Sequence, residues 1–303
     1  MNIVGRGVLA VTNRPSIRKL FSETSAGRRL SLRFVAGETL DDAASAVQEL
    51  NAAGAQVSLD HLGEHVTDAT EAIAARDDYL RCLDRIHADG LDANISVKLT
   101  QLGLGLDDDL AVESLGLLAE RAAEAGTTVT VDMEESELAE KTVSAFETIQ
   151  EQYGNIGIAV QSYLYRTPAD LDRIVARGGL VRLCKGAYAE PATVAHQDKD
   201  RVDAAFDALT RRLMATPGIV PAIATHDDER IELTKRLAPD RSEPWEFQML
   251  YGIRRNLQRE LLAAGYPLRV YVPYGTAWYP YLTRRMAERP ANLTFFLRAA
   301  VGR

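Results

Sequence analysis

The stretch NISVKLTQLGLGLDDDLAVESLGLLAERAAEAGTTVTVDM, residues 94–133, holds the pattern that decides the fold. It begins and ends with short runs rich in β-branched residues, NISVKL and TVTVDM. Between them, AVESLGLLAERAAEAG carries apolar residues at helical spacing. A strand, a helix and a second strand in this order predict a parallel βαβ unit. The run LGLGLDDD lacks the third glycine of a dinucleotide fingerprint and is interpreted as a loop and a helix start.

The same alternation continues along the chain after residue 54. Helical stretches such as RVDAAFDALTRRLMAT separate six further runs that resemble strands. These runs are QVSLDHLG (56–63), IGIAVQSY (156–163), LVRLCKGAY (180–188), VPAIATHD (220–227), EFQML (246–250) and RVYVPYG (269–275). Eight strand–helix units in about 250 residues match the size of an α/β protein with a closed (β/α)8 barrel of the TIM type. An open doubly wound sheet is the alternative.

The first 54 residues have a different, helical pattern. LDDAASAVQELNAAG (40–54) reads as an amphipathic helix, with Asp41 and Asp42 suited to its start and Gly54 to its stop. A length of 303 residues would by itself allow two domains. We therefore expect an N-terminal helical cap or extension over residues 1–54 and one catalytic barrel over residues 55–303.

Composition excludes several classes of protein. The chain is 46% hydrophobic, which provides for a large core, and its net charge of -8 disfavours nucleic-acid binding through the global field. Its two cysteines, Cys82 and Cys184, fit a reducing compartment rather than a disulfide framework. The sequence has neither an export signal nor a long apolar run. We expect a cytoplasmic protein with at most peripheral contact at the inner membrane surface.

Polar residues end all eight strand-like runs, and in a (β/α)8 barrel the active site lies at these carboxyl ends. They are Asp60 and His61, Lys98, Asp132, Gln161 and Ser162, Lys185, Thr225 with His226 and Asp227, Gln248, and Tyr271 to Tyr274. Lys98 and Asp132 end neighbouring strands and could pair, either to position a substrate anion or as a structural salt bridge. A barrel lysine can also form a Schiff base, so Lys98 or Lys185 would suit an aldolase.

The segment YPYLTRRMAERP (279–290) predicts a helix after the last strand, with prolines suited to its start and stop. Tyr281 lies three and four residues before Arg284 and Arg285, on the same helix surface. Two adjacent guanidinium groups suit a carboxylate ligand, and Glu288 can pair with Arg284. The alternative is a solvent-exposed helix face with a weak salt bridge.

Two further patterns bear on the chemistry. RLCKGAY places Arg182 and Lys185 beside a glycine whose backbone permits close approach by a phosphate or a flat cofactor. His61 and His65 are four residues apart but lack the order of a zinc-peptidase motif, so a metal site is the weaker interpretation. The sequence contains no Walker A motif, no GxSxG elbow and no Cys/His pair, which disfavours hydrolase chemistry.

Taken in order, the motifs resemble one family, proline dehydrogenase, whose members are FAD-dependent enzymes that oxidise L-proline to Δ1-pyrroline-5-carboxylate. The resemblance rests on SVKL, VDMEE, VQSYL, RLCKGAY, ATHD, FQMLYG and RVYVPYGTAWYPYLTRRMAERPAN, from about residue 57 to 298. Because the chain ends soon after the barrel, the resemblance implies the monofunctional bacterial type. It also implies that a quinone accepts the electrons and that a separate pyrroline-5-carboxylate dehydrogenase is functionally coupled.

The resemblance implies roles for matched residues, beginning with the L-proline site. The carboxylate binders are Lys98, Arg284 and Arg285, and the walls of the pocket are Leu183, Tyr188, Tyr271 and Tyr281. Asp132 and Arg182 are implied to be catalytic. Asp132 would support the cationic side chains, and Arg182 would lie near the reactive nitrogen of the flavin, where positive charge favours the reduced ring.

A second set of matched residues is implied to contact FAD. They are Met133, Gln161, Arg182, Lys185, Gly186, Ala187, Thr225, His226, Gln248, Leu250, Tyr251 and Glu288. Three nearby residues depart from the family pattern: Cys184, Ala189 and Glu190. The open alternatives are a flavoenzyme for a related cyclic amino acid such as 4-hydroxyproline, a Schiff-base aldolase, and a proline-sensing protein without catalysis. No metal is expected.

Overall fold

A closed barrel of eight parallel strands forms the centre of the molecule. The computed structural model describes residues 32–279 and residue 281. The strands are β1 (Gln56–His61), β2 (Ala93–Val97), β3 (Val129–Val131), β4 (Ile156–Gln161), β5 (Gly179–Cys184), β6 (Ile219–Ala224), β7 (Glu246–Leu250) and β8 (Leu268–Tyr274). Each strand pairs with the next, and β8 pairs with β1 over six residue pairs, from Gln56–Arg269 to His61–Tyr274. The eight predicted strands and the (β/α)8 barrel are confirmed, and the open sheet is excluded.

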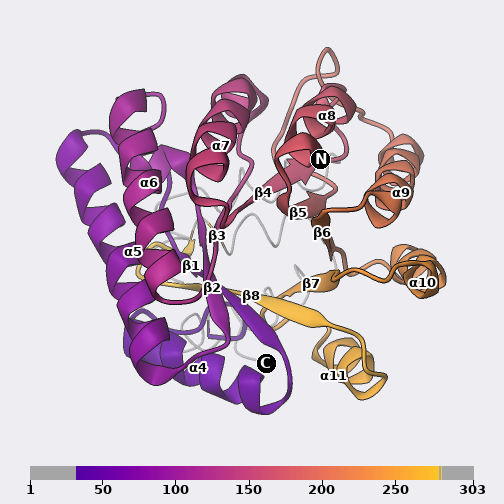
Figure 1. Cartoon of the computed structure of the whole chain (residues 1–303), viewed down its shortest axis with the longest axis horizontal. Coiled ribbons are helices and arrows are strands. Elements are labelled where there is room, and N and C mark those ends of the chain that lie inside the picture. Colours follow the sequence, from indigo (N-terminus) through magenta and orange to yellow (C-terminus); the bar gives the residue numbers. More distant parts are fainter. Residues whose placement is uncertain (1–31, 280, 282–303) are drawn as a thin grey trace, which may run out of the picture.

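Helices surround the barrel on its outside (Figure 1). They are α4 (Leu40–Ala52), α5 (Ala69–Asp89), α6 (Asp108–Glu124), α7 (Ala139–Tyr153), α8 (Thr167–Arg177), α9 (Lys199–Ala215), α10 (Asp228–Leu237) and α11 (Arg255–Ala263), with short 3-10 turns η1 (Leu99–Leu102), η2 (Ser136–Leu138) and η3 (Ala238–Asp240). Aspartates begin several of them: the side chains of Asp68, Asp107, Asp198 and Asp227 accept hydrogen bonds from backbone N–H groups of the first turn. None of the helices just named is long and apolar enough to cross a membrane.

Helix α4 covers the seam where the first and last strands meet. Thr39 and Asp42 form a capping box at its start, and Gly54 follows its end with a φ of +88°. Its buried residues Ala43 and Val47 belong to the same hydrophobic core as the barrel strands. The predicted helix over residues 40–54 is therefore confirmed, and the division of the chain at residue 54 into cap and barrel stays a prediction.

The alternation of side chains along each strand separates two layers of different chemistry. Residues that point away from the barrel axis, such as Val57, Ile95 and Val131, pack against helix residues such as Phe146 in one hydrophobic core. Residues that point inward are largely polar, and they include Ser58, Asp60, Ser96, Thr130, Arg182, Glu246, Gln248 and Arg269, all at most 9% exposed. Branched apolar residues usually fill such interiors. Here the core lies between strands and helices, and a polar network fills the barrel.

The network begins near the amino ends of β7 and β8. Arg269 Nε donates to Glu246 Oε1 at 2.8 Å, and Arg269 Nη1 donates to the carbonyl of Val57 at 3.0 Å. Gln248 then links this buried pair to the next layer, because its Nε2 donates to Glu246 Oε1 at 2.6 Å and its Oε1 accepts from Arg182 Nε at 2.5 Å. Polar contacts therefore run without a break through the barrel toward the carboxyl ends of the strands.

Candidate active site

Lys98 is the centre of the charged groups at the carboxyl ends of the strands. It follows β2 directly, and its side chain is 10% exposed. Its Nζ lies 3.0 Å from Asp60 Oδ1, 3.2 Å from Asp132 Oδ2 and 3.3 Å from the hydroxyl of Tyr271. A lysine ammonium group has three N–H donors, so each has a partner here. The predicted ion pair between Lys98 and Asp132 is present, and the strand ends converge as expected.

This setting keeps Lys98 charged. Burial alone would lower the pKa of its ammonium group, but the negative charges of Asp60 and Asp132 outweigh burial, and the pKa lies well above the ordinary lysine value. A Schiff base needs a neutral amine as its nucleophile. The geometry therefore disfavours the aldolase alternative at Lys98.

Asp132 connects Lys98 to the barrel interior. Its Oδ2 accepts from the Tyr271 hydroxyl at 2.8 Å, and its Oδ1 accepts from Ser96 Oγ at 2.8 Å and from Arg182 Nη1. Burial would raise the pKa of the carboxyl group. The positive charges of Lys98 and Arg182 lower this pKa by more than burial raises it, so it lies below the ordinary aspartate value. Asp132 is thus an ionised hydrogen-bond acceptor and a weak base at neutral pH.

Arg182 lies inside the barrel, where it is 3% exposed. Its Nη1 donates to Ser96 Oγ at 2.8 Å and its Nη2 to Ser58 Oγ at 3.3 Å, in addition to its bonds with Asp132 and Gln248. Its guanidinium carbon lies 5.2 Å from the centre of the Tyr271 ring. Four of its five N–H donors therefore have partners. Arg182 ties together residues of β1, β2, β5 and β7 beneath the mouth of the barrel.

The predicted wall residues differ in their surroundings. Tyr271 belongs to the Lys98 network, Tyr281 is buried, and Tyr188 is half-buried in the loop after β5. Leu183 is different: it has no exposed surface, follows the inward-facing Arg182, and lies in the hydrophobic core. Its role as a wall of the pocket stays a prediction. Arg284, Arg285 and Glu288 lie outside the described residues.

Predicted cofactor residues at the ends of β4 and β5 hold neighbouring loops together. Gln161 Nε2 donates to the carbonyl of Glu134 at 2.8 Å, and its Oε1 accepts from the backbone N–H of Ala187 at 3.3 Å. Gly186 has a φ of +123°, and a Cβ there would lie 2.2 Å from the ring of Tyr163. Glycine is therefore required at position 186 for both backbone conformation and space. Met133, at the end of β3, is 7% exposed.

The predicted residues at the ends of β6 and β7 also contact one another. His226 Nε2 accepts from the backbone N–H of Leu250 at 3.0 Å, and Thr225 Oγ1 accepts from the backbone N–H of Asp227 at 3.1 Å. Thr225 is buried, whereas His226, Leu250 and Tyr251 are half-buried. These strand ends thus present apolar and aromatic surface beside polar groups.

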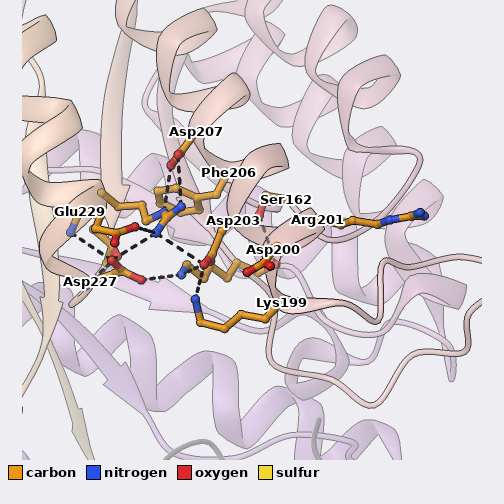
Figure 2. Close-up of polar contacts among 12 residues, drawn as sticks. Ser162, Lys199, Asp200, Arg201, Asp203, Phe206, Asp207, Asp227 and Glu229 are labelled. Carbon is orange, nitrogen blue, oxygen red and sulfur yellow. Dashed lines mark hydrogen bonds and ion pairs between the residues drawn. The ribbon is translucent and has the colours of Figure 1, made fainter.

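Lys185 belongs to a second group of charges at the rim of the barrel, of which Figure 2 labels Asp203, Asp227 and Lys199. Its Nζ donates to Asp227 Oδ2 at 2.9 Å and also to Asp203 Oδ1, from the first turns of α9. Asp203 accepts a further bond from Lys199 and lies 3.5 Å from Arg230 Nη1. Burial would raise the pKa values of both aspartates, but hydrogen bonds from Lys185 help to hold them below the ordinary value.

The two histidines of the metal alternative have separate partners. His61 Nδ1 lies 3.7 Å from Asp78 Oδ2, and His65 Nε2 lies 3.2 Å from Glu135 Oε1. They therefore do not form one ligand pair. Ligand-type atoms of His65, Glu134 and Glu135 lie within 4.8 Å of one another, and this grouping alone assigns no metal.

Comparison with known proteins assigns the chain to a family. Residues 43–298 match the proline dehydrogenase family. The chain belongs to the proline dehydrogenase family. It is 39% identical over 281 residues to proline dehydrogenase 1 of Bacillus subtilis subsp. natto, with 92% of this chain and 93% of the relative covered. It is 37% identical over 301 residues to the proline dehydrogenase of Deinococcus radiodurans, with 97% and 96% covered.

A solved structure supports the fold. The crystal structure of proline utilization A from Bdellovibrio bacteriovorus, inactivated by N-propargylglycine, superposes with a TM-score of 0.83 at 23% sequence identity. The alignment covers 93% of the present chain and 36% of that longer chain. Membership of the proline dehydrogenase family makes the protein an oxidoreductase that oxidises proline in proline catabolism, and it implies a flavin cofactor.

The residues at the ends of β4 to β7 fit a flavin, which is a flat group and, as a nucleotide, carries anionic phosphates. Gly186 is half-buried and has a backbone conformation and a close approach to Tyr163 that only glycine permits. Lys185 uses two of its three N–H donors on described residues. Leu250 and Tyr251 add half-buried apolar and aromatic surface. The donor set and the glycine both suit the cofactor that the proline dehydrogenase family implies.

The sequence indicated no binding partner for four residues of the site, although it placed Asp60 among the polar strand ends. Ser58 and Ser96 bind Arg182, Asp60 binds Lys98, and Asp203 binds Lys185. The two serines could have been predicted from the sequence. Ser58 lies two residues before Asp60, and Ser96 lies two residues before Lys98, so each serine points to the same inward side of its strand as the residue at the strand end. Asp203 lies on a helix, and no strand-end pattern indicates it.

Proposed function

We propose that this protein catalyses the FAD-dependent oxidation of L-proline to Δ1-pyrroline-5-carboxylate by hydride transfer to the flavin, the first step of proline catabolism, and that a quinone receives the electrons. One observation carries this function within the family: a charged Lys98, buried between Asp60 and Asp132, lies beside Tyr271 at the mouth of the barrel. A buried cation at this position suits an amino-acid carboxylate.

Binding of the substrate carboxylate at Lys98 requires an exchange of partners, because all three N–H donors are in use. The contact with the Tyr271 hydroxyl is the longest, at 3.3 Å, and therefore the weakest. We infer that a carboxylate oxygen replaces this hydroxyl, while Tyr271 keeps its 2.8 Å bond to Asp132. Arg284 and Arg285 would supply the paired guanidinium donors, and Tyr188, Tyr271 and Tyr281 would enclose the ring.

The chain's own residues would bind, orient and exclude water. Asp132 keeps Lys98 charged, and Arg182 holds the floor of the site, so these two would act as the catalytic pair. Because the lowered pKa makes Asp132 a weak base, proline would bind with its amine neutral. When bound, the flavin supplies the redox chemistry by accepting two electrons and a proton as hydride.

Residues on the β3 to β7 side of the mouth would hold the cofactor. They are Met133, Gln161, Arg182, Lys185, Gly186, Ala187, Thr225, His226, Gln248, Leu250 and Tyr251, with Glu288 beyond the described residues. The partners in this function are the quinone and a separate pyrroline-5-carboxylate dehydrogenase that consumes the product. The corresponding location is the cytoplasm, with peripheral contact at the inner membrane as the route to the quinone.

A spectroscopic experiment tests this function. The purified protein should show the visible bands of bound FAD, and L-proline added without oxygen should bleach them. A parallel titration with 4-hydroxyproline measures the preference between the two substrates by kcat/KM. Bands that persist with L-proline would refute the function, and a higher kcat/KM for 4-hydroxyproline would favour the related flavoenzyme.

A further inference from the structure

The Asp203 cluster consists of Lys185, Lys199, Asp203, Asp227 and Arg230, and it joins the end of β5 to the starts of α9 and α10 (Figure 2). Asp203 is its centre, since it accepts from both lysines and lies 3.5 Å from Arg230 Nη1. The side chain of Asp203 is 6% exposed, whereas that of Lys199 is 77% exposed. The fold therefore buries one carboxylate among three cations at the rim of the barrel.

This arrangement restricts Lys185. A lysine side chain has many rotamers in solution, and that of Lys185 is 30% exposed. Asp203 and Asp227 hold its ammonium group from two sides, which fixes the direction of the remaining N–H bond. The position of Asp203 is fixed in turn, because Arg230 is bound by Asp207 at 3.0 Å and 3.2 Å.

We propose that Asp203 is a positioning residue for Lys185, and that it holds the ammonium group ready for an anionic group of the flavin cofactor. This role rests on the proposed function, which assigns Lys185 to the cofactor. Asp203 reaches the cofactor only through Lys185. Its effect should therefore be visible in cofactor affinity and should disappear when Lys185 is removed.

The substitution Asp203→Asn separates positioning from charge, because the two effects have opposite signs. Loss of a negative charge alone would make the rim more positive and would tighten the binding of an anionic cofactor. If positioning is lost, the Lys185 side chain must become ordered when the cofactor binds, and this entropy cost weakens cofactor binding. Ordering one long side chain changes a Kd by roughly three- to tenfold. We expect Asp203→Asn to raise the Kd for FAD by at least about threefold.

Two further variants provide the controls. Asp200→Asn removes an exposed carboxylate from the first turn of the same helix, where the side chain of Asp200 bonds to no described residue, and it should change the Kd for FAD less than about twofold. Lys185→Met should weaken FAD binding by itself. Adding Asp203→Asn to Lys185→Met should then have little further effect, because the two residues act as one unit.

The measurement is a fluorescence titration of flavin-stripped protein with FAD, with circular dichroism to confirm that each variant is folded. If Asp203→Asn does not fold, Asp203→Glu keeps the charge, displaces the carboxylate and should weaken binding in the same direction. An unchanged or lower Kd in the folded variant would overturn the positioning role while the proposed function stands. A wild-type protein that binds no FAD would overturn the cofactor and this role together.

Discussion

Two lysines at the carboxyl ends of the strands are held by carboxylates in different ways. Lys98 lies in the barrel interior with 10% of its side chain exposed, and two carboxylates and a tyrosine take all three of its N–H donors. Lys185 lies at the rim with 30% exposed, and two carboxylates take two of its donors. Among the described residues, the interior charge thus has a partner for every N–H donor, whereas the rim charge has one N–H donor that none of them accepts.

Removing the shared interior carboxylate should have the largest effect. Asp132→Asn leaves Lys98 and Arg182 buried without the anion that both contact, and breaking such a buried pair costs about 3–5 kcal/mol. We expect the free energy of unfolding, measured by denaturant titration, to fall by about this amount. Asp207→Asn at the rim, where the side chain is 26% exposed, should cost less than about 1 kcal/mol. If both variants lost the same free energy of unfolding, the proposed difference between interior and rim carboxylates would be wrong.

Replacing Glu134 should change the free energy of unfolding by less than Asp132→Asn does, and it should stabilise the protein at neutral pH rather than destabilise it. This carboxyl group accepts from the backbone N–H and hydroxyl of Thr100, but burial raises its pKa above the ordinary glutamate value. The folded state therefore binds the proton more tightly than the unfolded state, and this group lowers stability as pH rises from the ordinary pKa through the raised one.

Glu134→Gln removes that pH dependence. We expect its free energy of unfolding, relative to wild type, to increase between mildly acidic and neutral pH, as measured by denaturant titration across this range. A relative stability that stays constant or falls with pH would contradict the raised pKa. Asp132, whose pKa is lowered, contributes stability that is instead lost in acid.

The smallest predicted change is in the KM for proline, and it comes from breaking a contact between two loops at the rim. Glu190 accepts from the backbone N–H of Ser136 at 2.7 Å and from its hydroxyl at 2.5 Å, and so ties the loop that carries Tyr188 to η2. Glu190→Gln weakens one of these bonds and should raise the KM for proline about two- to fivefold with little change in kcat, on the scale of one hydrogen bond. Steady-state kinetics measure both values. Ser136→Ala should act in the same direction, and an unchanged KM in both variants would exclude this role.

The sequence was sufficient for the fold because two periodicities agree along the chain. Runs of β-branched residues alternate with helical stretches, and the structure contains a strand at every run. The convergence of Lys98 with Asp132 also followed, since parallel strands in a barrel bring their ends together. The roles of Leu183 and the other wall residues rest on the resemblance alone and stay predictions.

Contacts between a strand end and a helix could not be predicted in the same way. Asp203 lies 18 residues after Lys185, and only the path of the β5–α9 connection brings their side chains together. No periodicity in the sequence carries that information. Buried partners on strands, such as Ser58 and Ser96, are more accessible to prediction because alternation fixes their direction.

The polar network has a consequence for how the barrel can be assembled. Among the charged residues of this network that the structure describes, the half built from β1 to β4 contributes Asp60, Lys98 and Asp132, two anions and one cation. The half built from β5 to β8 contributes Arg182, Glu246 and Arg269, two cations and one anion. Within these six residues, each half-barrel alone would therefore bury an unbalanced charge of opposite sign, and the two charges balance only when the halves come together. Separately produced halves should attract each other yet remain poorly folded apart, which makes closure of the sheet and neutralisation of its interior a single event.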